Sequence, residues 1–247
     1  MGLSLHGFPH RLNKLEERMR LQKDPEVITG NHRRPTFLLG FITLGMVPIE
    51  WCVTMMRLQC PINCHMESLL VKGMEVGVAR NYLAEYAIKL EPRPEYILMI
   101  GDDMLASWNS LLLLYEEMKK GEYDVMSGLY FMKSDPYTPP MAVMAKTNIE
   151  GYMTPGVHFQ VGEVVGVDIV CGMDFTMIRT DIFDKLGPQP WFKSADSKSM
   201  FDPETGGISL FTEDTFFIGK VVKAGFKVAV HSGCRVGHLS IKTGEVY

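Results

Sequence analysis

The first half of the chain alternates continuous apolar runs with amphipathic segments. Residues 36–43, TFLLGFIT, are apolar almost throughout, which is typical of a strand buried on both faces. The same alternation continues along the chain, with strands expected over 62–71, 96–100 and 123–131 and helices over 49–59, 78–90 and 107–120. This order predicts an α/β fold with a mainly parallel central sheet, helices on both faces, and ligands bound at the carboxyl ends of the strands.

The second half of the chain has a different pattern. From about residue 132 the segments become short and Pro-rich, which predicts a smaller, mixed half. Residues 179–188 indicate a compact helix, and residues 211–231 indicate a helix followed by a strand. Between them lies a polar loop over 194–207, whose 14 residues are enough to form a lid.

The domain organisation follows from the same pattern. Residues 12–22 predict a short charged helix that precedes the alternating segments, so we expect an N-terminal helical extension over 1–34. The remainder, 35–247, is expected to form a single domain with two halves, 35–131 and 132–247. A chain of 247 residues with 46% hydrophobic content can bury one large core.

Composition narrows the classes of partner. The net charge of −4 gives no general attraction to nucleic acid or to an anionic membrane. The most apolar stretch, 37–53, is interrupted by Thr43, Gly45, Pro48 and Glu50, so no membrane span is predicted. The N-terminus lacks a signal-peptide pattern, and five cysteines cannot all pair internally, so a reducing cytoplasm is the expected location.

Two adjacent carboxylates, Asp102 and Asp103, directly follow the apolar run 96–100. A strand-ending turn alone could explain them, because Gly and Asp suit turns. Placed at the end of a buried strand, they also suit a hard divalent cation such as Mg²⁺ or Mn²⁺, which binds carboxylate and phosphate oxygens. The pair therefore points toward a nucleoside diphosphate. The segment CPINCH, 60–65, is an incomplete ligand set for structural zinc.

Five short motifs strengthen the second interpretation by their order: ARN at 79–81, GDDM at 101–104, CGMDF at 171–175, TED at 212–214 and VGH at 236–238. In this order the chain resembles the GT-A fold glycosyltransferases, specifically family-2-like members, from about Thr36 to Leu239. The resemblance implies a glycosyltransferase with a nucleotide-sugar-binding half over 35–131 and an acceptor-binding half over 132–247. It also implies a nucleotide-sugar donor, most often a UDP-sugar, and usually Mn²⁺ or Mg²⁺.

The resemblance assigns the donor side as follows. Asp103 and His238 match the metal ligands, and Asp102 would face the ribose or sugar of the donor. Gly101 departs from the family pattern, because many relatives have there the first Asp of a triple. Arg80 matches an arginine near the donor phosphates or the Asp motif. The remaining donor residues, which match the nucleoside cradle at the end of the first strand, are Thr43, Gly45 and Met46.

The resemblance also assigns the catalytic and acceptor sides. Asp214 would be the general base of an inverting transfer, with Glu213 positioning the acceptor. Acidic residues also suit the first turn of any helix, so this pair has a purely structural interpretation as well. The residues that match the acceptor segment, each of which could equally serve packing, are Cys171, Gly172, Asp174 and Trp191.

Two further residues and the activity itself each allow a second interpretation. His238 could be a satisfied structural histidine, and Arg80 could form a surface ion pair with Glu75 or Glu85. A sugar-1-phosphate nucleotidyltransferase would share the sheet and the metal, although no Gly-rich basic loop follows the first strand. A non-catalytic nucleotide-sugar or glycan-binding protein would share the fold. The acceptor could be a glycan, a lipid, a protein or a modified DNA base, and the oligomeric state is not predicted.

Overall fold

The computed structural model describes residues 36–62, 64–134, 141–147, 153–155, 158–194 and 212–247. Contacts divide the chain into two compact units, Met1–Arg33 and Arg34–Tyr247. The predicted helix over 12–22 and nearly all of the predicted lid over 194–207 lie outside the described residues. The elements named in the following paragraphs all belong to the second unit.

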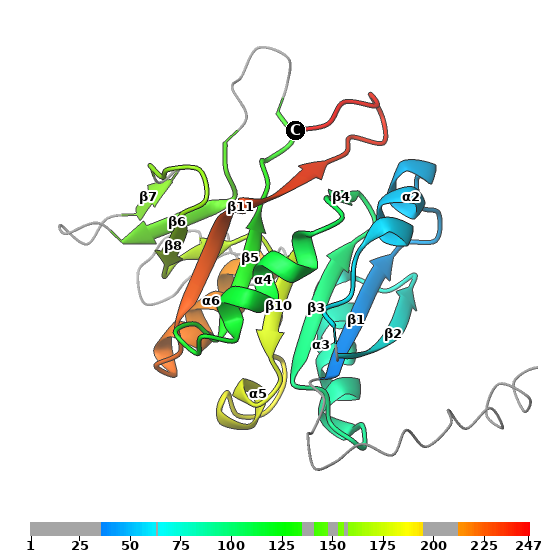
Figure 1. Cartoon of the computed structure of the whole chain (residues 1–247). Coiled ribbons are helices and arrows are strands. Elements are labelled where there is room, and N and C mark those ends of the chain that lie inside the picture. Colours follow the sequence, from blue (N-terminus) through cyan, green and yellow to red (C-terminus); the bar gives the residue numbers. More distant parts are fainter. Residues whose placement is uncertain (1–35, 63, 135–140, 148–152, 156–157, 195–211) are drawn as a thin grey trace, which may run out of the picture. The chain divides into compact units, whose positions relative to one another are not determined.

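This unit combines short helices with many strands (Figure 1). The helices are α2 (Ile49–Arg57), α3 (Val76–Lys89), α4 (Ser110–Met118), α5 (Ile182–Lys185) and α6 (Glu213–Lys223). The first strands are β1 (Thr36–Thr43), β2 (His65–Lys72), β3 (Tyr96–Gly101), β4 (Met104–Ala106), β5 (Val125–Leu129) and β6 (Met144–Thr147). The later strands are β7 (Met153–Pro155), β8 (Val164–Val167), β9 (Val170–Cys171), β10 (Phe175–Arg179) and β11 (Val228–His238).

The large sheet has the order β2-β1-β3-β10-β5-β11-β4, and β8 also pairs with β11. Strands β2, β1, β3, β5 and β11 point in one direction, while β10 lies antiparallel between β3 and β5. A separate small sheet has the order β7-β6-β9. The predicted α/β fold with a mostly parallel central sheet is therefore confirmed, and the antiparallel strand β10 is an addition that the hydrophobic pattern did not reveal.

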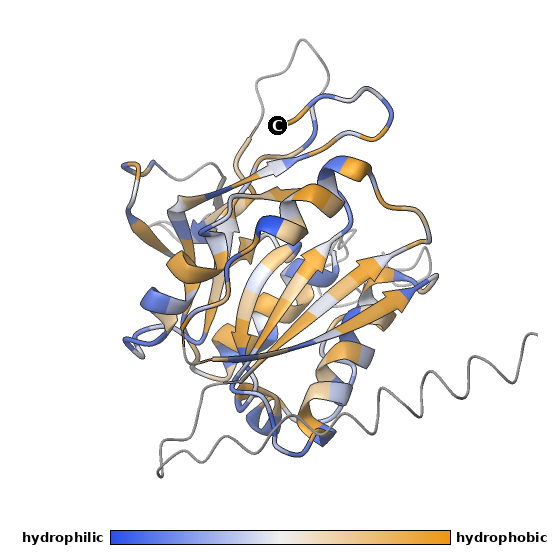
Figure 2. Cartoon of the chain, turned by 45° about the vertical axis from the view of Figure 1, so that its right-hand side comes forward, coloured by the Kyte–Doolittle hydropathy of each residue, from blue (hydrophilic) through white to orange (hydrophobic). Residues whose placement is uncertain are grey.

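Helices cover both faces of the large sheet, as predicted. Every residue of β3 is buried, and its side chains alternate between two cores. Ile97 and Met99 belong to the core with the apolar residues of α3 and α6, whereas Leu98 and Ile100 belong to the core with α2 and α4. Figure 2 shows the strands as a hydrophobic layer between these helices. Burying each such side chain stabilises the fold by about 1.5–3 kcal/mol, which explains the continuous apolar runs.

Several predicted boundaries were wrong by a few residues. The helix expected over 107–120 spans only Ser110–Met118. Residues 104–106, just before the predicted start, form the short strand β4, which pairs with the end of β11. The helix expected over 179–188 is the single turn α5, Ile182–Lys185. Arg179, where the helix was expected to begin, is the last residue of β10. None of the described helices is long and apolar enough to cross a membrane.

Candidate functional site

The first polar group lies where β3, β5 and β11 end. Asp103 follows β3, and the pairing of β4 with β11 places His238 opposite Met104 and therefore next to Asp103. The Nε2 atom of His238 lies 3.4 Å from Oδ2 of Asp103, and Nζ of Lys133 forms an ion pair with the same oxygen. We call Asp103, His238 and Lys133 the strand-end group.

The orientation of His238 is fixed by its other ring nitrogen. Nδ1 lies 2.8 Å from the carbonyl oxygen of Phe131, and the ring of Tyr130 packs edge-on against the imidazole. A carbonyl oxygen can only accept, so Nδ1 donates to it, and this contact holds the ring with Nε2 turned toward Asp103. Burial alone would raise the pKa of Asp103, but His238 and Lys133 outweigh it and hold the pKa below its ordinary value.

The second polar group surrounds Arg80 of α3, whose side chain is only 1% exposed. One terminal nitrogen of Arg80 donates to both Glu213 and Asp214, and the other donates to Asp174, each at 2.6 Å. Three carboxylates around one guanidinium leave the group with excess negative charge. We call these four residues the arginine group.

Local structure presents these side chains to one another. Thr212 caps α6, so Glu213 and Asp214 occupy its first turn, where the helix dipole favours acidic residues. Glu75 caps α3 by accepting from the backbone N–H of Val78. The hydroxyl of Ser194 donates to Glu75 at 2.7 Å and to Glu213 at 3.4 Å, which links the starts of the two helices.

The electrostatics single out Asp214. Burial raises the pKa of Asp214 to about 7; the nearby carboxylates of Asp174 and Glu213 add to this effect, and Arg80 opposes it. Burial likewise raises the pKa of Asp174, again against Arg80. A carboxyl group that titrates near neutral pH can accept a proton and release it again, which is what a general base requires.

The predicted nucleoside residues lie at the end of β1. The backbone N–H of Gly45 donates to the hydroxyl of Thr43 at 3.0 Å, and the positive φ of Gly45, 144°, favours glycine there. Met46 is exposed and lines a cavity of about 370 Å³ whose opposite wall is the C-terminal segment 239–246. That segment follows His238, and the N–H of Leu239 donates to the backbone oxygen of Asp103, so the cavity adjoins the strand-end group.

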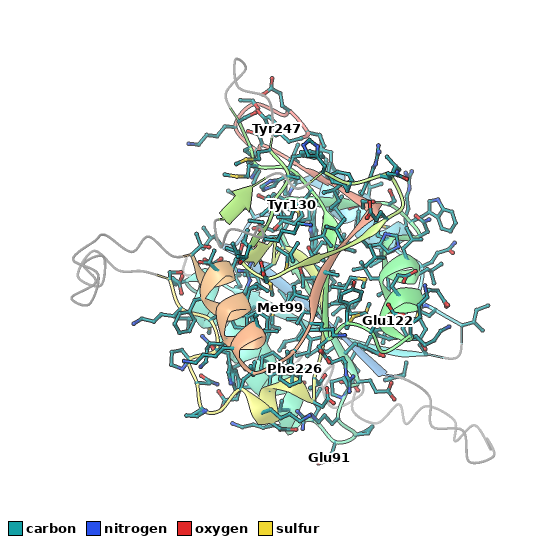
Figure 3. The ribbon with its side chains drawn as sticks, turned by 90° about the vertical axis from the view of Figure 1, so that its left-hand side faces the viewer. Glu91, Met99, Glu122, Tyr130, Phe226 and Tyr247 are labelled. Atoms are coloured by element: carbon teal, nitrogen blue, oxygen red, sulfur yellow. The ribbon has the colours of Figure 1, made fainter. Side chains whose placement is uncertain are left out.

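Three of the predicted acceptor residues lie inside the protein. Cys171 is fully buried, and the carbonyl of Gly172 accepts from the hydroxyls of Ser127 and Thr176. A side chain at Gly172 would collide with the hydroxyl of Tyr130, which Figure 3 labels above the centre of the sheet. Trp191 is buried, and its indole N–H donates to the carbonyl of Gly187. These contacts give packing reasons for all three residues.

Asp174 and Asp102 differ from these three. Asp174 reaches Arg80, as described above, and retains 32% side-chain exposure. Asp102 precedes Asp103 in the turn after β3 and is partly exposed. The predicted surface ion pair of Arg80 with Glu75 or Glu85 is wrong, because Arg80 is buried among the carboxylates of Asp174 and α6.

Two residues of the site were not singled out from the sequence. Lys133 lies 30 residues after Asp103, in a Pro-rich segment with no motif of its own. Asn81, the residue after Arg80, accepts from the backbone N–H groups of Trp191 and Phe192 and donates to the carbonyl of Phe192. The ARN motif therefore holds both the arginine group and the segment that carries Trp191.

The strand-end group fits one side of a divalent cation. Asp103 offers a carboxylate oxygen and His238 an imidazole nitrogen, both of which Mn²⁺ accepts. Within the described residues, no group of three or more His, Cys, Asp or Glu side chains could hold a metal ion. Diphosphate oxygens and water would have to complete the coordination, as is usual for Mg²⁺-type ions, and Lys133 would have to share or release Asp103.

Comparison with known proteins identifies the fold. No family model matches the chain, and no curated protein is significantly similar in sequence. The structure of A197 from STIV matches with a TM-score of 0.55 and 15% identity over 83% of this chain and 86% of that chain. GalNAc-T7, solved with UDP, GalNAc and Mn²⁺, matches with a TM-score of 0.53 and 12% identity over 84% of this chain and 43% of that chain. The fold is thus GT-A-like.

Proposed function

We propose that this chain is a glycosyltransferase that moves a sugar from a nucleotide-sugar donor to an acceptor hydroxyl with inversion at the anomeric carbon. The observation that carries the proposal is that two features lie close together at the carboxyl ends of the strands. One is Asp214, whose pKa is near 7; the other is the strand-end group beside an apolar cavity. The GT-A-like fold, shared with an enzyme crystallised with UDP and GalNAc, supports a nucleotide-sugar donor.

In the proposed transfer, the acceptor oxygen attacks the anomeric carbon while its proton passes to a carboxylate oxygen of Asp214. The bond between the anomeric carbon and the diphosphate oxygen breaks, and the diphosphate leaves with the bonding electron pair. Arg80 holds Asp214 and Glu213 in place through hydrogen bonds of 2.6 Å. Glu213 would position the acceptor beside the base.

The departing diphosphate gains negative charge, so cations near it lower the barrier. Lys133 brings such a charge to Asp103 at the end of β3. A bound Mn²⁺ or Mg²⁺, held by Asp103 and His238, would supply Lewis-acid stabilisation of the same oxygens. Thr43, Gly45 and Met46 would border the nucleoside, and the neighbouring enzyme's ligand favours UDP as the first candidate.

The setting of the reaction is also part of the proposal. All five cysteines are free, and a reducing cytoplasm is consistent with that state.

The acceptor stays open among a glycan, a lipid, a protein and a modified DNA base. A nucleotidyltransferase would instead react a sugar 1-phosphate with a nucleoside triphosphate, and a binding protein would turn over no substrate. Incubation with a nucleotide sugar, and separately with a sugar 1-phosphate and a nucleoside triphosphate, therefore distinguishes the three functions.

We expect Asp103→Ala to abolish the stabilisation that Mn²⁺ adds to nucleoside diphosphate binding. The variant removes the only carboxylate of the strand-end group, so the metal would keep one protein ligand, His238. The measurement is the melting temperature with UDP, GDP, CDP or dTDP, each with Mn²⁺ and with EDTA. Asp184→Ala, which removes a carboxylate paired with Arg93 on the surface, is the matched control. Full Mn²⁺-dependent stabilisation of Asp103→Ala would remove Asp103 from the site.

We also expect the rate of transfer at low substrate concentration to rise with pH and to level off above about 7. The base must be ionised to accept a proton, and the pKa of Asp214 is raised to about 7, so the active fraction falls about tenfold per pH unit well below that value. A series of initial rates between pH 5 and 9 tests this expectation. A rate that stays constant from pH 5 to 8 would contradict the assignment of Asp214.

A further inference from the structure

Gly101, the last residue of β3, has no side chain, and a side chain at this position would face Asp174. The backbone N–H of Gly101 donates to the carbonyl of Asp174, and its own carbonyl accepts from the indole N–H of Trp51, both at 2.8 Å. A Cβ atom built on Gly101 would lie 3.0 Å from Cβ of Asp174 and 3.2 Å from its Cγ and Oδ1 atoms. The side chain of Asp174 therefore occupies the space that a side chain at position 101 would use.

Asp174 also stands between the two polar groups of the site. Its Oδ1 atom accepts from Arg80 at 2.6 Å, and its backbone carbonyl accepts from the N–H of Gly101, two residues before Asp103. It is the most exposed carboxylate of the arginine group, at 32%, compared with 15% for Glu213 and 17% for Asp214. Of the three, it is thus the best placed to contact a ligand bound beside the strand-end group.

Neutralising Arg80 does not require Asp174. Glu213 and Asp214 already pair with one terminal nitrogen of Arg80, and a single carboxylate is enough to balance the charge of a guanidinium. A third carboxylate adds repulsion, and a partly buried carboxylate in excess of its counter-charges is unfavourable for the folded state. Ionisable groups perturbed by burial and by like charges cluster at functional sites.

We propose that Asp174 is a donor-binding residue: from the neighbouring strand it supplies the carboxylate that β3 lacks at Gly101, and it accepts a hydrogen bond from a hydroxyl of the donor's sugar. This inference rests on the proposed function, and it moves Asp174 from the acceptor side, where the sequence placed it, to the donor side. The contacted group is a sugar hydroxyl rather than the diphosphate, because a carboxylate repels phosphate oxygens.

The test compares nucleoside diphosphates with their sugar conjugates, in wild type, in two variants of Asp174 and in a control variant. Calorimetry would measure the affinities of UDP, GDP, CDP and dTDP and of their glucose conjugates, with UDP-GalNAc added, for wild type, Asp174→Asn and Asp174→Gly. We expect the sugar conjugate to bind about 10- to 100-fold more weakly to either variant, as for a lost hydrogen bond to a charged group, while the diphosphate keeps its affinity. The control is Asp168→Asn, which changes an exposed carboxylate that accepts a hydrogen bond from the backbone N–H of Thr147.

The double variant Gly101→Asp with Asp174→Gly separates binding from folding. Gly101 has no positive φ, so an aspartate fits its backbone once Asp174 is gone, and its carboxylate would enter the same space. We expect the double variant to bind the sugar conjugate at least about tenfold more tightly than Asp174→Gly. Melting curves of all variants exclude unfolding as the cause.

Each result decides between the proposals. Equal losses for the diphosphate and the conjugate, or an unchanged affinity for the conjugate, would show that Asp174 only supports Arg80 and would overturn the inference while leaving the proposed function intact. A double variant no better than Asp174→Gly would also overturn it. A wild-type protein that binds none of these nucleotides would overturn the proposed function, and the inference with it.

Discussion

Asp214→Asn is expected to slow sugar transfer by about 10²- to 10⁴-fold, the usual contribution of a general base. Asparagine keeps the size of the side chain and can still accept a hydrogen bond from Arg80, but its amide cannot take up the acceptor's proton. Asp214 is not among the residues proposed to bind the donor, so the affinity for the donor should hardly change. Single-turnover transfer and donor binding, measured on the same preparation, test both statements.

The matched variant is Glu213→Gln, which changes the other carboxylate on the same nitrogen of Arg80. It should reduce the rate less, because Glu213 only positions the acceptor in the proposed mechanism. Normal transfer by Asp214→Asn together with an inactive Glu213→Gln would move the base to Glu213. If both variants transferred at the wild-type rate, the inverting mechanism would fail.

The stability of Asp214→Asn gives an independent check. A carboxyl group whose pKa is raised on folding contributes stability that is present below its unfolded pKa and lost as pH rises through its folded value, here about 7. Asparagine does not titrate, so the variant should gain stability relative to wild type between pH 5.5 and 8. A stability difference independent of pH would show that folding does not raise the pKa of Asp214.

Hydrophobic periodicity was sufficient to predict the sheet and its helical covering. Strand β3 is apolar along its whole length because both of its faces lie against helices, and a local pattern records that fact directly. The position of β10 in the sheet could not be predicted from such a local pattern. It pairs with β3, which precedes it by more than seventy residues, and no local pattern carries information about such a partner.

The same limit applies to the site. The acidity of the first turn of α6 and the pair after β3 are local signals, so Glu213, Asp214 and Asp103 were recognised as candidates. The partners of Arg80 are not local, because they lie 94, 133 and 134 residues further along the chain. The packing of α3 and α6 on one face of the sheet brings Glu213 and Asp214 to Arg80, and the pairing of β10 with β3 brings Asp174. Lys133 reaches Asp103 in the same way, through the order of strands rather than through any motif.

These long-range contacts make Arg80 the residue on which both the fold and the site depend. We expect Arg80→Met to lower the free energy of unfolding at pH 7.5 by about 3–5 kcal/mol, as for other buried ion pairs that lose one partner. Methionine fills much of the same volume, so the loss would come from three carboxylates left without their counter-charge. Urea denaturation measures the change.

The matched control for that experiment is Arg179→Met, since Arg179 pairs with Asp181 and Asp124 but is 37% exposed. A surface pair of this kind contributes at most about 1 kcal/mol. Without Arg80, the pKa values of Asp174 and Asp214 should rise further in the folded protein, so the deficit of Arg80→Met should shrink as the pH falls from 7.5 to 5.5. A loss of less than 1 kcal/mol, or one that does not change with pH, would mean that the three carboxylates do not depend on Arg80 and that Arg80 does not oppose the raised pKa of Asp214.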